Sequence, residues 1–436
     1  MISIQTNGAL GDGRTVNTEA IQRTIDVVAQ AGGGTVLVPS GHFICGPLAL
    51  RSNVFLHLEA GALLQAHRVI EGWPIIKDLY PAELNNGRSS DAGSVCHPFI
   101  YAENSSNIGI TGNGIINGSG EVWWPHVKTG KIGNRRPRLI VFAGCDNVLL
   151  DGFRAENSPQ WTINPVCCEN VVIRGLTVFN PPDSPNTDGI NPDSCRHVRI
   201  SGCHIDVGDD CITLKSGTET ACRPAERRAC ENIIISECLM LHGHGAVVIG
   251  SEMSGGVRNV VISNCIFNGT DRGIRFKSRR GRGGIVENVR VQSIVMDDVK
   301  TPIVANLFYV CGARGEARVA DLHAYPVDET TPRMERLHFS QITAKRAHHA
   351  AVFLYGLPEM PIKDVMLNEI DIQMSPDAKE GDADMAIMIP KMKRRAFFAR
   401  HVSGLSLCSV KVEGFEGPFI DAQDCMDLRN YEGGNI

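Results

Sequence analysis

Four short segments of this chain share one pattern when they are aligned on a serine. Apolar residues or a proline stand four and two positions before each serine, and this period of two is typical of β-strands with one buried face. The serines are 22, 35 and 27 residues apart, and a unit that recurs about every 20–50 residues indicates a solenoid. The segments are Asp188–Ser194, Asp210–Ser216, Gly245–Ser251 and Arg272–Ser278.

A second repeat runs through most of the chain. An asparagine followed by valine or isoleucine opens a short apolar stretch, and Gly, Asn, Asp or Pro turns separate these stretches. Each repeat is expected to carry two or three strands of about four to six residues, with no helix between them. The marker asparagines are Asn53, Asn107, Asn147, Asn170, Asn232, Asn259 and Asn288.

Parallel strands stacked coil upon coil satisfy both repeats, because one coil cannot bury its apolar face alone and its neighbours lie about 4.8 Å away. We therefore predict an all-β fold, a parallel β-helix of about ten coils. A solenoid of this length is expected to be a single domain over residues 1–436, with an N-terminal cap over about 1–40 and coils over about 41–430.

One helix is expected near the start of the chain, over residues 17–30. Asn17 is a common capping residue, and apolar residues then recur at helical spacing up to a run of three glycines. We expect this helix to cover the open first coil, since an uncovered strand edge invites pairing with other chains.

Titratable residues occupy matching positions in the aligned segments. Two aspartates stand six residues before their serines, an aspartate and a histidine stand seven before, and the fourth strand carries two cations on its outward face. If the segments stack, these side chains meet on one surface. A cluster of titratable side chains is typical of a catalytic site and not of a hydrophobic core. They are Asp188, Asp209, Asp210, His244, Arg275 and Lys277.

Three crowded carboxylates suit glycoside hydrolysis, in which one carboxylic acid protonates the leaving oxygen and another carboxylate activates water or attacks. Clustered carboxylates cannot all ionise cheaply, so one proton is expected to remain near neutral pH. Gly208 predicts a turn that lets Asp209 and Asp210 face one cleft. Gly243 and Gly245 are expected to leave room for a ligand beside the histidine between them.

The cations indicate what the substrate carries. Arg275 and Lys277 lie on one strand face, and Lys215 falls in the same position of its own segment as Lys277. Cations placed in this way are suited to carboxylates, so the expected substrate is an acidic sugar polymer or oligomer.

Composition excludes several other classes of function. The net charge of −5 gives no reason to expect a nucleic-acid partner, and no run of about 18 apolar residues predicts a membrane span. The 15 cysteines lack metal-type spacing, and residues 1–10 lack the features of a secretory signal. We expect a cytoplasmic protein that needs no metal and no cofactor.

Four short motifs resemble the signature of glycoside hydrolase family 28, the polygalacturonases. The resemblance spans nearly the whole chain, and all four motifs are intact. It implies a right-handed parallel β-helix that hydrolyses α-1,4-linked galacturonate in oligogalacturonides with inversion. The motifs are Asn186–Asp188, Gly208–Asp210, Gly243–Gly245 and Arg275–Lys277.

The resemblance also implies a role for each motif residue. Asp209 would be the general acid, and Asp188 and Asp210 would activate water. His244 would tune the acid. Asn186, Arg275 and Lys277 would bind the substrate, the last two through the galacturonate carboxylate. Relatives that cut rhamnogalacturonan usually lack the histidine and cation motifs, so homogalacturonan is the favoured substrate.

The segment Ser251–Gly256 is similar to that of bacterial exo-acting members, which trim oligogalacturonides from the non-reducing end. Loops over residues 66–98 and 118–137 could close one end of the cleft, with Arg135 and Arg136 reaching the terminal uronate. The tryptophans of the second loop could stack on sugar rings or simply pack on the solenoid.

Three alternatives stay open at this point. A pectate lyase would use acidic residues to bind Ca²⁺, a related β-helix enzyme could cleave rhamnogalacturonan, and a silent β-helix could bind glycans without catalysis.

Overall fold

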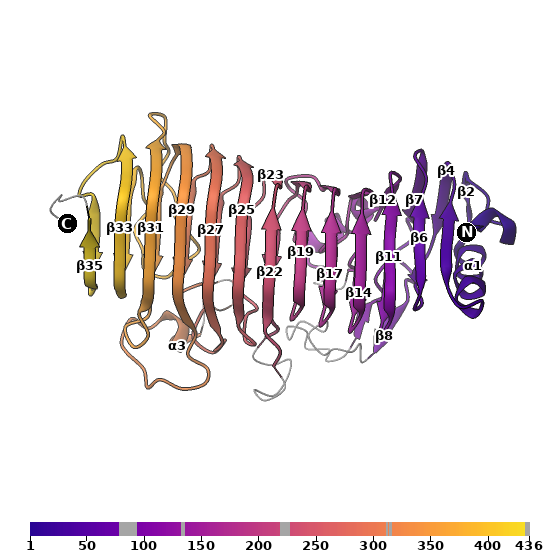
Figure 1. The fold of residues 1–436 in the computed structure, drawn as a ribbon, viewed down its shortest axis with the longest axis horizontal. Helices are drawn as coiled ribbons and strands as arrows, with labels where there is room; N and C mark the ends of the chain where they lie inside the picture. The colour runs from indigo at the N-terminus through magenta and orange to yellow at the C-terminus, as the bar shows by residue number, and fades with distance from the viewer. Residues whose placement is uncertain (78–93, 132–135, 219–226, 311–312, 314–315, 432–436) are drawn as a thin grey trace. The chain divides into compact units, whose positions relative to one another are not determined.

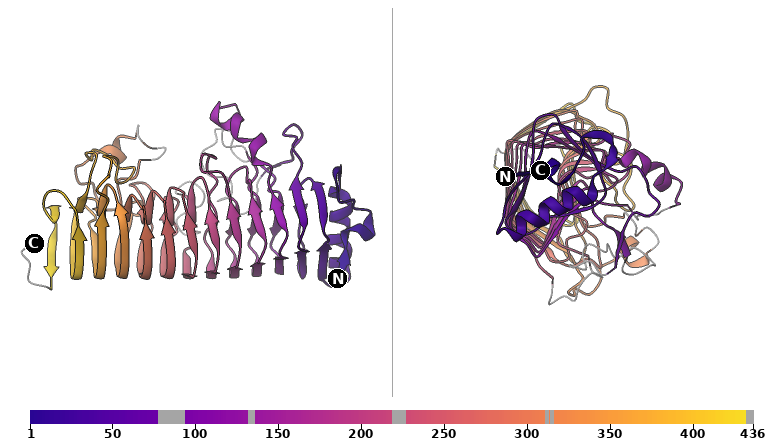
Figure 2. Two further views of the ribbon diagram at one scale, coloured as in Figure 1. Left: turned by 90° about the horizontal axis from the view of Figure 1, so that it is seen from above. Right: turned by 90° about the vertical axis from the view of Figure 1, so that its right-hand side faces the viewer.

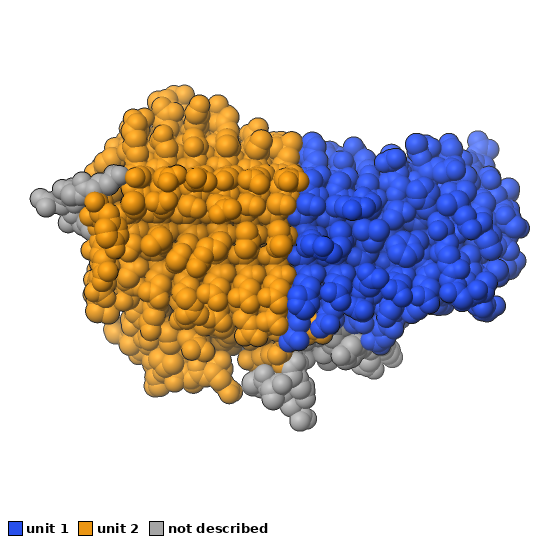
Figure 3. All heavy atoms as spheres, in the orientation of Figure 1, with its two compact units in different colours: residues 1–209 blue, residues 210–436 orange. Residues whose placement is uncertain are grey.

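The structure is a computed structural model of the protein, and it divides the chain into two compact units, residues 1–209 and 210–436 (Figure 3). The single domain expected over residues 1–436 stays a prediction. The structure describes residues 1–77, 94–131, 136–218, 227–310, 313 and 316–431.

Unit 1 arranges its main strands in three rows of parallel neighbours, and strands of the first two rows are labelled in Figure 1. The first row contains β1 (Ile2–Ser3), β3 (Gly34–Val38), β6 (Val54–Leu58), β11 (Ser106–Gly112), β14 (Asp146–Asp151), β17 (Glu169–Arg174) and β19 (Arg196–Ser201). The second contains β2 (Asp12–Val16), β4 (Gly41–Cys45), β7 (Ala62–Ala66), β12 (Ile115–Asn117), β15 (Arg154–Glu156), β18 (Thr177–Phe179) and β20 (His204–Asp206). The third contains β5 (Leu48–Ala49), β10 (Ile100–Glu103), β13 (Ile140–Ala143) and β16 (Ile163–Val166).

Shorter elements interrupt these rows. An antiparallel pair, β8 with β9, belongs to the interruption predicted over residues 66–98, and η3 and α2 belong to the one predicted over 118–137. The bounds are η1 (Ile4–Asn7), β8 (Ile75–Lys77), β9 (Ser94–Cys96), η3 (Gly120–Val122) and α2 (Trp124–Lys128).

The core of unit 1 is built from columns of apolar side chains in register. Ile110, Leu150, Ile173 and Ile200 are paired strand to strand, and each is at most 1 % exposed. Burying such side chains contributes about 1.5–3 kcal/mol each. This column is the physical form of the period-two pattern in the sequence.

The helix expected over residues 17–30 is present as α1 (Thr18–Gln30) at the N-terminal end of unit 1 (Figure 2). Its apolar face is buried, including Ile21 and Ile25. Asn17, however, makes no capping bond to the helix. Its side chain exchanges hydrogen bonds with the backbone of Leu10 instead and also donates to Ile44, so it ties the helix start to neighbouring segments. The role of α1 in covering the first coil stays a prediction.

The repeated asparagines mark one recurrent turn. All seven adopt the left-handed backbone conformation, with φ between 53° and 63°, which asparagine tolerates better than most residues. Their amides also stack: Asn147 donates to Asn107, which donates to Asn53, and in unit 2 Asn259 donates to Asn232. The sequence marker therefore reflects both a backbone requirement and a ladder of side-chain hydrogen bonds.

Unit 2 contains two rows of parallel strands (Figure 1). The long row contains β22 (Cys230–Ser236), β25 (Val257–Asn268), β27 (Ile285–Asp297), β29 (Arg333–Ala347), β31 (Ile362–Met374), β33 (Val402–Glu413) and β35 (Met426–Asn430), and β23 (Leu239–Leu241) also pairs with β25. The other contains β21 (Asp210–Leu214), β24 (Gly245–Gly250), β26 (Arg272–Lys277), β28 (Thr301–Asn306), β30 (Ala350–Tyr355), β32 (Arg395–Arg400) and β34 (Ile420–Gln423). A short helix, α3 (Ala317–Ala320), follows β28.

The predicted strand length is wrong for the long row of unit 2, where five strands run for 12–15 residues. In unit 1 a glycine with positive φ, such as Gly152 or Gly175, separates the two shorter strands of each coil. In β25 and β27 that corner is held by Asn264 and Ser293. Each bends the chain at a single left-handed residue, so the ladder continues through the corner.

Two further observations bear on the expected class of protein. None of the 13 cysteines among the described residues forms a disulfide. No helix in the described ranges is long and apolar enough to cross a membrane.

Candidate active site

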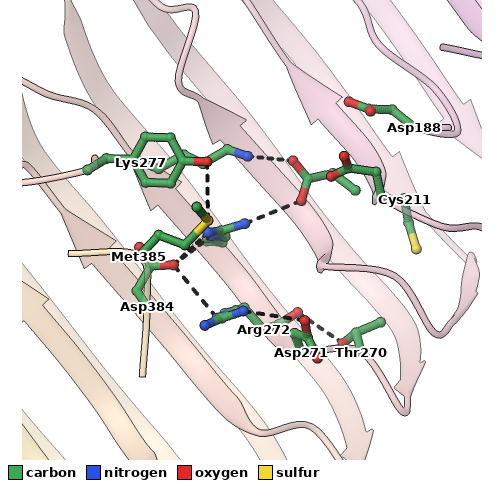
Figure 4. Close-up of polar contacts among 12 residues, drawn as sticks. Asp188, Cys211, Thr270, Asp271, Arg272, Lys277, Asp384 and Met385 are labelled. Atoms are coloured by element: carbon green, nitrogen blue, oxygen red, sulfur yellow. Dashed lines mark hydrogen bonds and ion pairs between the residues drawn. The ribbon is translucent and has the colours of Figure 1, made fainter. Parts of the chain in front are cut away.

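Parallel pairing in unit 2 brings Asp210 next to the two predicted cations. Asp210 opens β21, and Arg275 and Lys277 lie on β26, two strands along the same row. The Lys277 Nζ lies 2.6 Å from Asp210 Oδ2, and the Arg275 Nη1 lies 3.5 Å from Oδ1 (Figure 4). The alignment on serine is thus confirmed for its three segments in unit 2.

Gly245 makes this approach possible. It pairs with Asp210 on the strand between the carboxylate and the cations. A Cβ at this position would lie 3.3 Å from Asp210 Oδ1 and 2.5 Å from a methyl carbon of Val248, so a larger residue would push into the ion pairs. The space beside Gly245 is filled by side chains of the protein, and the expected room for a ligand beside His244 stays a prediction.

The two cations are largely buried. Arg275 is 2 % exposed and Lys277 is 6 % exposed, and the ring of Tyr309 lies within 5.5 Å of both charged groups. Burial lowers the pKa of Arg275, but the charges of Asp384, Tyr309 and Asp210 outweigh it and raise the pKa above the usual value. The guanidinium therefore stays charged.

Asp384 is the close partner of Arg275 and was not predicted from the sequence. Its Oδ1 accepts hydrogen bonds from Arg275 Nε at 3.0 Å and Nη2 at 2.6 Å. Asp384 lies 109 residues further along the chain, in a segment that sequence analysis did not connect with the site. No local pattern links the two, because the contact depends on how a loop folds back over the strands.

His244 lies in the turn before β24 and is exposed. Burial raises the pKa of Asp271, but Lys300, Arg272 and the charge of His244 outweigh it and lower the pKa below the usual range. His244 is thus close enough to Asp271 to affect it electrostatically. Its predicted role in tuning the acid stays a prediction.

Lys215 lies in the same column as Lys277, as expected, because Leu214 pairs with Ile249 and the next residue, Gly250, pairs with Lys277. The Lys215 Nζ forms an ion pair of 2.9 Å with Glu252. Burial raises the pKa of Glu252, but Lys215, Arg282 and Lys277 outweigh it and hold the pKa well below the usual range. A carboxylate of the protein thus already offsets the charge of Lys215.

The remaining predicted residues, Asn186, Asp188 and Asp209, lie in unit 1 close to Arg136. Asn186 donates from Nδ2 to Asp209 Oδ2 at 3.4 Å, and its Oδ1 accepts from Arg136 Nη2 at 2.9 Å. Asp188 is buried at 4 % exposure and accepts from Asn191 at 3.1 Å. The proximity of Asp188 and Asp209 to the residues of unit 2 stays a prediction.

Gly208 lies in a bend before Asp209, and the expectation that this bend lets Asp209 and Asp210 face one cleft stays a prediction. A Cβ at Gly208 would lie 2.4 Å from the carbonyl oxygen of Ser184, so only glycine fits before Asp209. The N–H of Gly208 donates to the Thr187 hydroxyl at 3.3 Å. The turn is therefore packed directly against the segment that carries Asn186.

Arg136 is a second functional candidate that sequence analysis placed differently. It is 3 % exposed, and its Nη1 donates to the carbonyl oxygens of Pro159 and Pro185 at 2.9 and 2.6 Å. Burial lowers its pKa to about 10, while the charges of Asp188 and Asp209 act in the opposite direction. Arg136 is thus a buried cation beside the predicted catalytic carboxylates, not a surface group that reaches a terminal uronate. Arg135 lies outside the described residues.

The tryptophans of the loop over residues 118–137 pack on the protein. Trp123 is 2 % exposed and meets Trp73 edge to face at 5.6 Å, and Trp124 donates to the carbonyl oxygen of Ser158. Trp123 therefore cannot offer a free face to a sugar.

Comparison with known proteins decides the family. The family model described as "Glycosyl hydrolases family 28" matches residues 35–384, most of the chain. The chain belongs to this family. A "Probable polygalacturonase" of Vitis vinifera is 33 % identical over 377 residues, which cover 86 % of this chain and 74 % of that protein.

Solved structures agree with this family 28 assignment. A hyperthermoactive exopolygalacturonase from Thermotoga maritima is 30 % identical, with a TM-score of 0.73 over 86 % of this chain and 87 % of that one. A family 28 exopolygalacturonase from Yersinia enterocolitica, 22 % identical, covers 100 % and 79 % with a TM-score of 0.79 and shows the same fold. The predicted all-β, right-handed parallel β-helix is thereby confirmed, and the number of coils stays a prediction.

Metal ligands were not expected in this family 28 chain. Among the described residues, no group of three or more His, Cys, Asp and Glu side chains is arranged to hold a metal ion. The expectation that activity needs neither metal nor cofactor stays a prediction.

Proposed function

We propose that the protein is a polygalacturonase that hydrolyses α-1,4 bonds between galacturonate residues in oligogalacturonides. The observation that carries this proposal is the buried group of Arg275 and Lys277 around Asp210 in a family 28 chain. Two cations in one place are costly to bury without anions. The carboxylate of a uronate substrate could interact with these two cations, whereas a neutral glycan has no carboxylate.

The proposed reaction is hydrolysis with inversion. Asp209 gives its proton to the leaving oxygen, and Asp188 and Asp210 draw a proton from the water that attacks the opposite face of the sugar. The contact between Asn186 and Asp209 supports a role for Asn186 in holding the acid in place. His244, which is exposed beside Asp271, is proposed to tune the acid.

Lys277 and Arg275 have separate tasks in this proposal. Lys277 holds Asp210 at 2.6 Å, which favours the ionised carboxylate that a base must have. Arg275, at 3.5 Å from Asp210, keeps its Nη1 edge for the galacturonate carboxylate. The pair would then bind the substrate and orient the base from one strand.

We propose that attack is exo, releasing galacturonate from the non-reducing end. The 30 % identical Thermotoga maritima structure is an exopolygalacturonase, and this likeness supports the same mode here. A cytoplasmic location fits an enzyme that receives short imported fragments, and the lack of disulfides among the described cysteines favours a reducing compartment.

A product time course on tetragalacturonate tests the proposal. With EDTA present, we expect saturated products, monomeric galacturonate at the earliest time point, and chains that shorten one unit at a time. Early dimer as the main product would contradict exo attack. Unsaturated products that absorb ultraviolet light, dependent on added Ca²⁺, would indicate a lyase. No turnover of any galacturonide would contradict the proposed function itself.

A further inference from the structure

The loop between β31 and β32 places one buried carboxylate against the cations of β26. The Asp384 side chain is 0 % exposed. Its Oδ1 receives two hydrogen bonds from Arg275, and its Oδ2 receives one from Asn306 Nδ2 at 2.7 Å. Arg272 Nε lies 3.7 Å from the same Oδ1 (Figure 4).

The backbone on either side of Asp384 is also fixed. Arg272 donates from Nε to the carbonyl oxygen of Ala383 at 3.1 Å and from Nη2 to that of Asp382 at 2.9 Å. The N–H of Val310 donates to the carbonyl oxygen of Met385 at 3.2 Å. The carboxylate is therefore held by hydrogen bonds from Arg275 on β26 and Asn306 on β28.

Charge explains why a carboxylate is needed here. The side chains of Arg275 and Arg272 are 2 % and 12 % exposed. Burial and the charge of Arg275 lower the pKa of Arg272. Burial alone would raise the pKa of Asp384, but Arg275 and Arg272 outweigh it and hold the pKa below the usual range. Asp384 thus remains ionised and offsets two neighbouring guanidinium groups.

The geometry divides the donors of Arg275 between two carboxylates. Asp384 takes Nε and Nη2, and Nη1 faces Asp210 at a longer distance. A guanidinium is planar and rigid, so binding one edge fixes the direction of the other. The side of Arg275 that remains for another carboxylate is therefore set by Asp384.

We propose that Asp384 is a positioning residue that orients Arg275 for the substrate carboxylate. This inference rests on the proposed function, in which Arg275 binds galacturonate. Asp384 does not touch the substrate. It acts through the guanidinium, and the loop over residues 378–394 belongs to the active site for this reason.

The test is Asp384→Asn, which keeps the shape of the side chain and removes its charge. We expect the KM for tetragalacturonate to rise about 10- to 100-fold, the range for a hydrogen bond to a charged group, with a smaller change in kcat. Asp377→Asn is the matched control, because Asp377 is exposed and lies outside the loop over residues 378–394, and its KM should equal that of the wild type. An unchanged KM in Asp384→Asn would overturn the inference.

A double-mutant cycle separates positioning from general damage. In an Arg275→Gln background, Asp384→Asn should change kcat/KM by less than about 2-fold, because residues that act through one another are not additive. Equal effects in both backgrounds would mean that Asp384 acts independently of Arg275.

Binding and folding are measured separately. If Asp384→Asn does not fold, Asn306→Ala weakens the hold on the same carboxylate, and it should raise KM about 3- to 10-fold. No rise would overturn the inference. Calorimetry with trigalacturonate in an Asp209→Asn background, where turnover is suppressed, decides the case: binding that the added Asp384→Asn substitution leaves unchanged refutes positioning. Binding by the wild type without hydrolysis refutes only the proposed function, and no binding by the wild type refutes both.

Discussion

Asp210 and Lys277 are 67 residues apart in sequence and 2.6 Å apart in the structure. Their contact was predictable because the strands stack in register, so equal positions in the repeat become neighbours. Asp384 and Arg136 were not predictable. Each reaches its partners from a loop, and the path of a loop depends on tertiary contacts that a period in the sequence does not describe.

Asp209→Asn should reduce turnover of oligogalacturonide by about 10²–10⁴-fold, because an amide keeps the shape of the acid but cannot deliver a proton. Asp183→Asn is the control, since Asp183 forms a surface pair with Lys128 and should keep normal activity. Steady-state kcat for both variants, with circular dichroism to check the fold, makes the comparison. A near-normal kcat in Asp209→Asn would mean that another residue is the acid.

Arg136→Gln should move both limbs of the kcat/KM pH profile to higher pH. The guanidinium charge and the charges of Asp188 and Asp209 favour one another. Without the cation, both carboxylates keep their protons up to a higher pH. The base therefore becomes ionised, and the acid becomes deprotonated, only at higher pH. Arg174→Gln, which removes a surface arginine paired with Asp151, should leave the profile in place. A shift to lower pH would contradict the electrostatic account.

At the scale of elements, the turn chemistry was the most reliable signal. The asparagine marker located a left-handed corner in coil after coil, because asparagine tolerates that conformation better than most residues do. Strand length was less predictable. Whether a corner ends a strand depends on whether the backbone hydrogen bonds to the neighbouring strands continue past it. Asn264 is an example, because it bends the chain within β25 without ending the strand.

Two substitutions at Asn259 separate the backbone from the amide ladder. Asn259 has φ 56° and hydrogen bonds to Asn232 and Asn288. Asn259→Ala should lower the free energy of unfolding by about 1–2 kcal/mol, since alanine is strained in this region. Asn259→Gly should cost less, because glycine adopts the conformation freely. Urea unfolding midpoints measure both effects. If the two variants lose equal stability, the contribution of Asn259 comes from its side-chain hydrogen bonds alone and not from its backbone conformation.

At the scale of the molecule, the fold class and the family followed from the period of the repeat and from four short motifs, because a solenoid repeats its local rules along the chain. Ionisation of the buried groups was less accessible from sequence. His349 is one example: burial, followed by the charges of Arg272, His348 and Lys300, lowers its pKa to about 4.

This histidine should make stability depend on pH. Because the folded-state pKa is below the ordinary value of about 6.5, the unfolded chain binds the proton more tightly. His349 therefore lowers stability progressively as pH falls from about 6.5 to 4, and not above that range. His349→Gln should flatten this part of the curve of Tm against pH, while His204→Gln at an exposed position should not. Identical curves for His349→Gln and the wild type would contradict the assignment.

The stereochemistry of the first product tests the proposed inverting hydrolysis most directly. Trigalacturonate is mixed with the enzyme in D₂O, and proton NMR follows the anomeric signals before mutarotation. Water activated on the face opposite the leaving group must give the β-anomer of the new reducing end first. Appearance of the α-anomer first, or of an unsaturated sugar, would contradict the account.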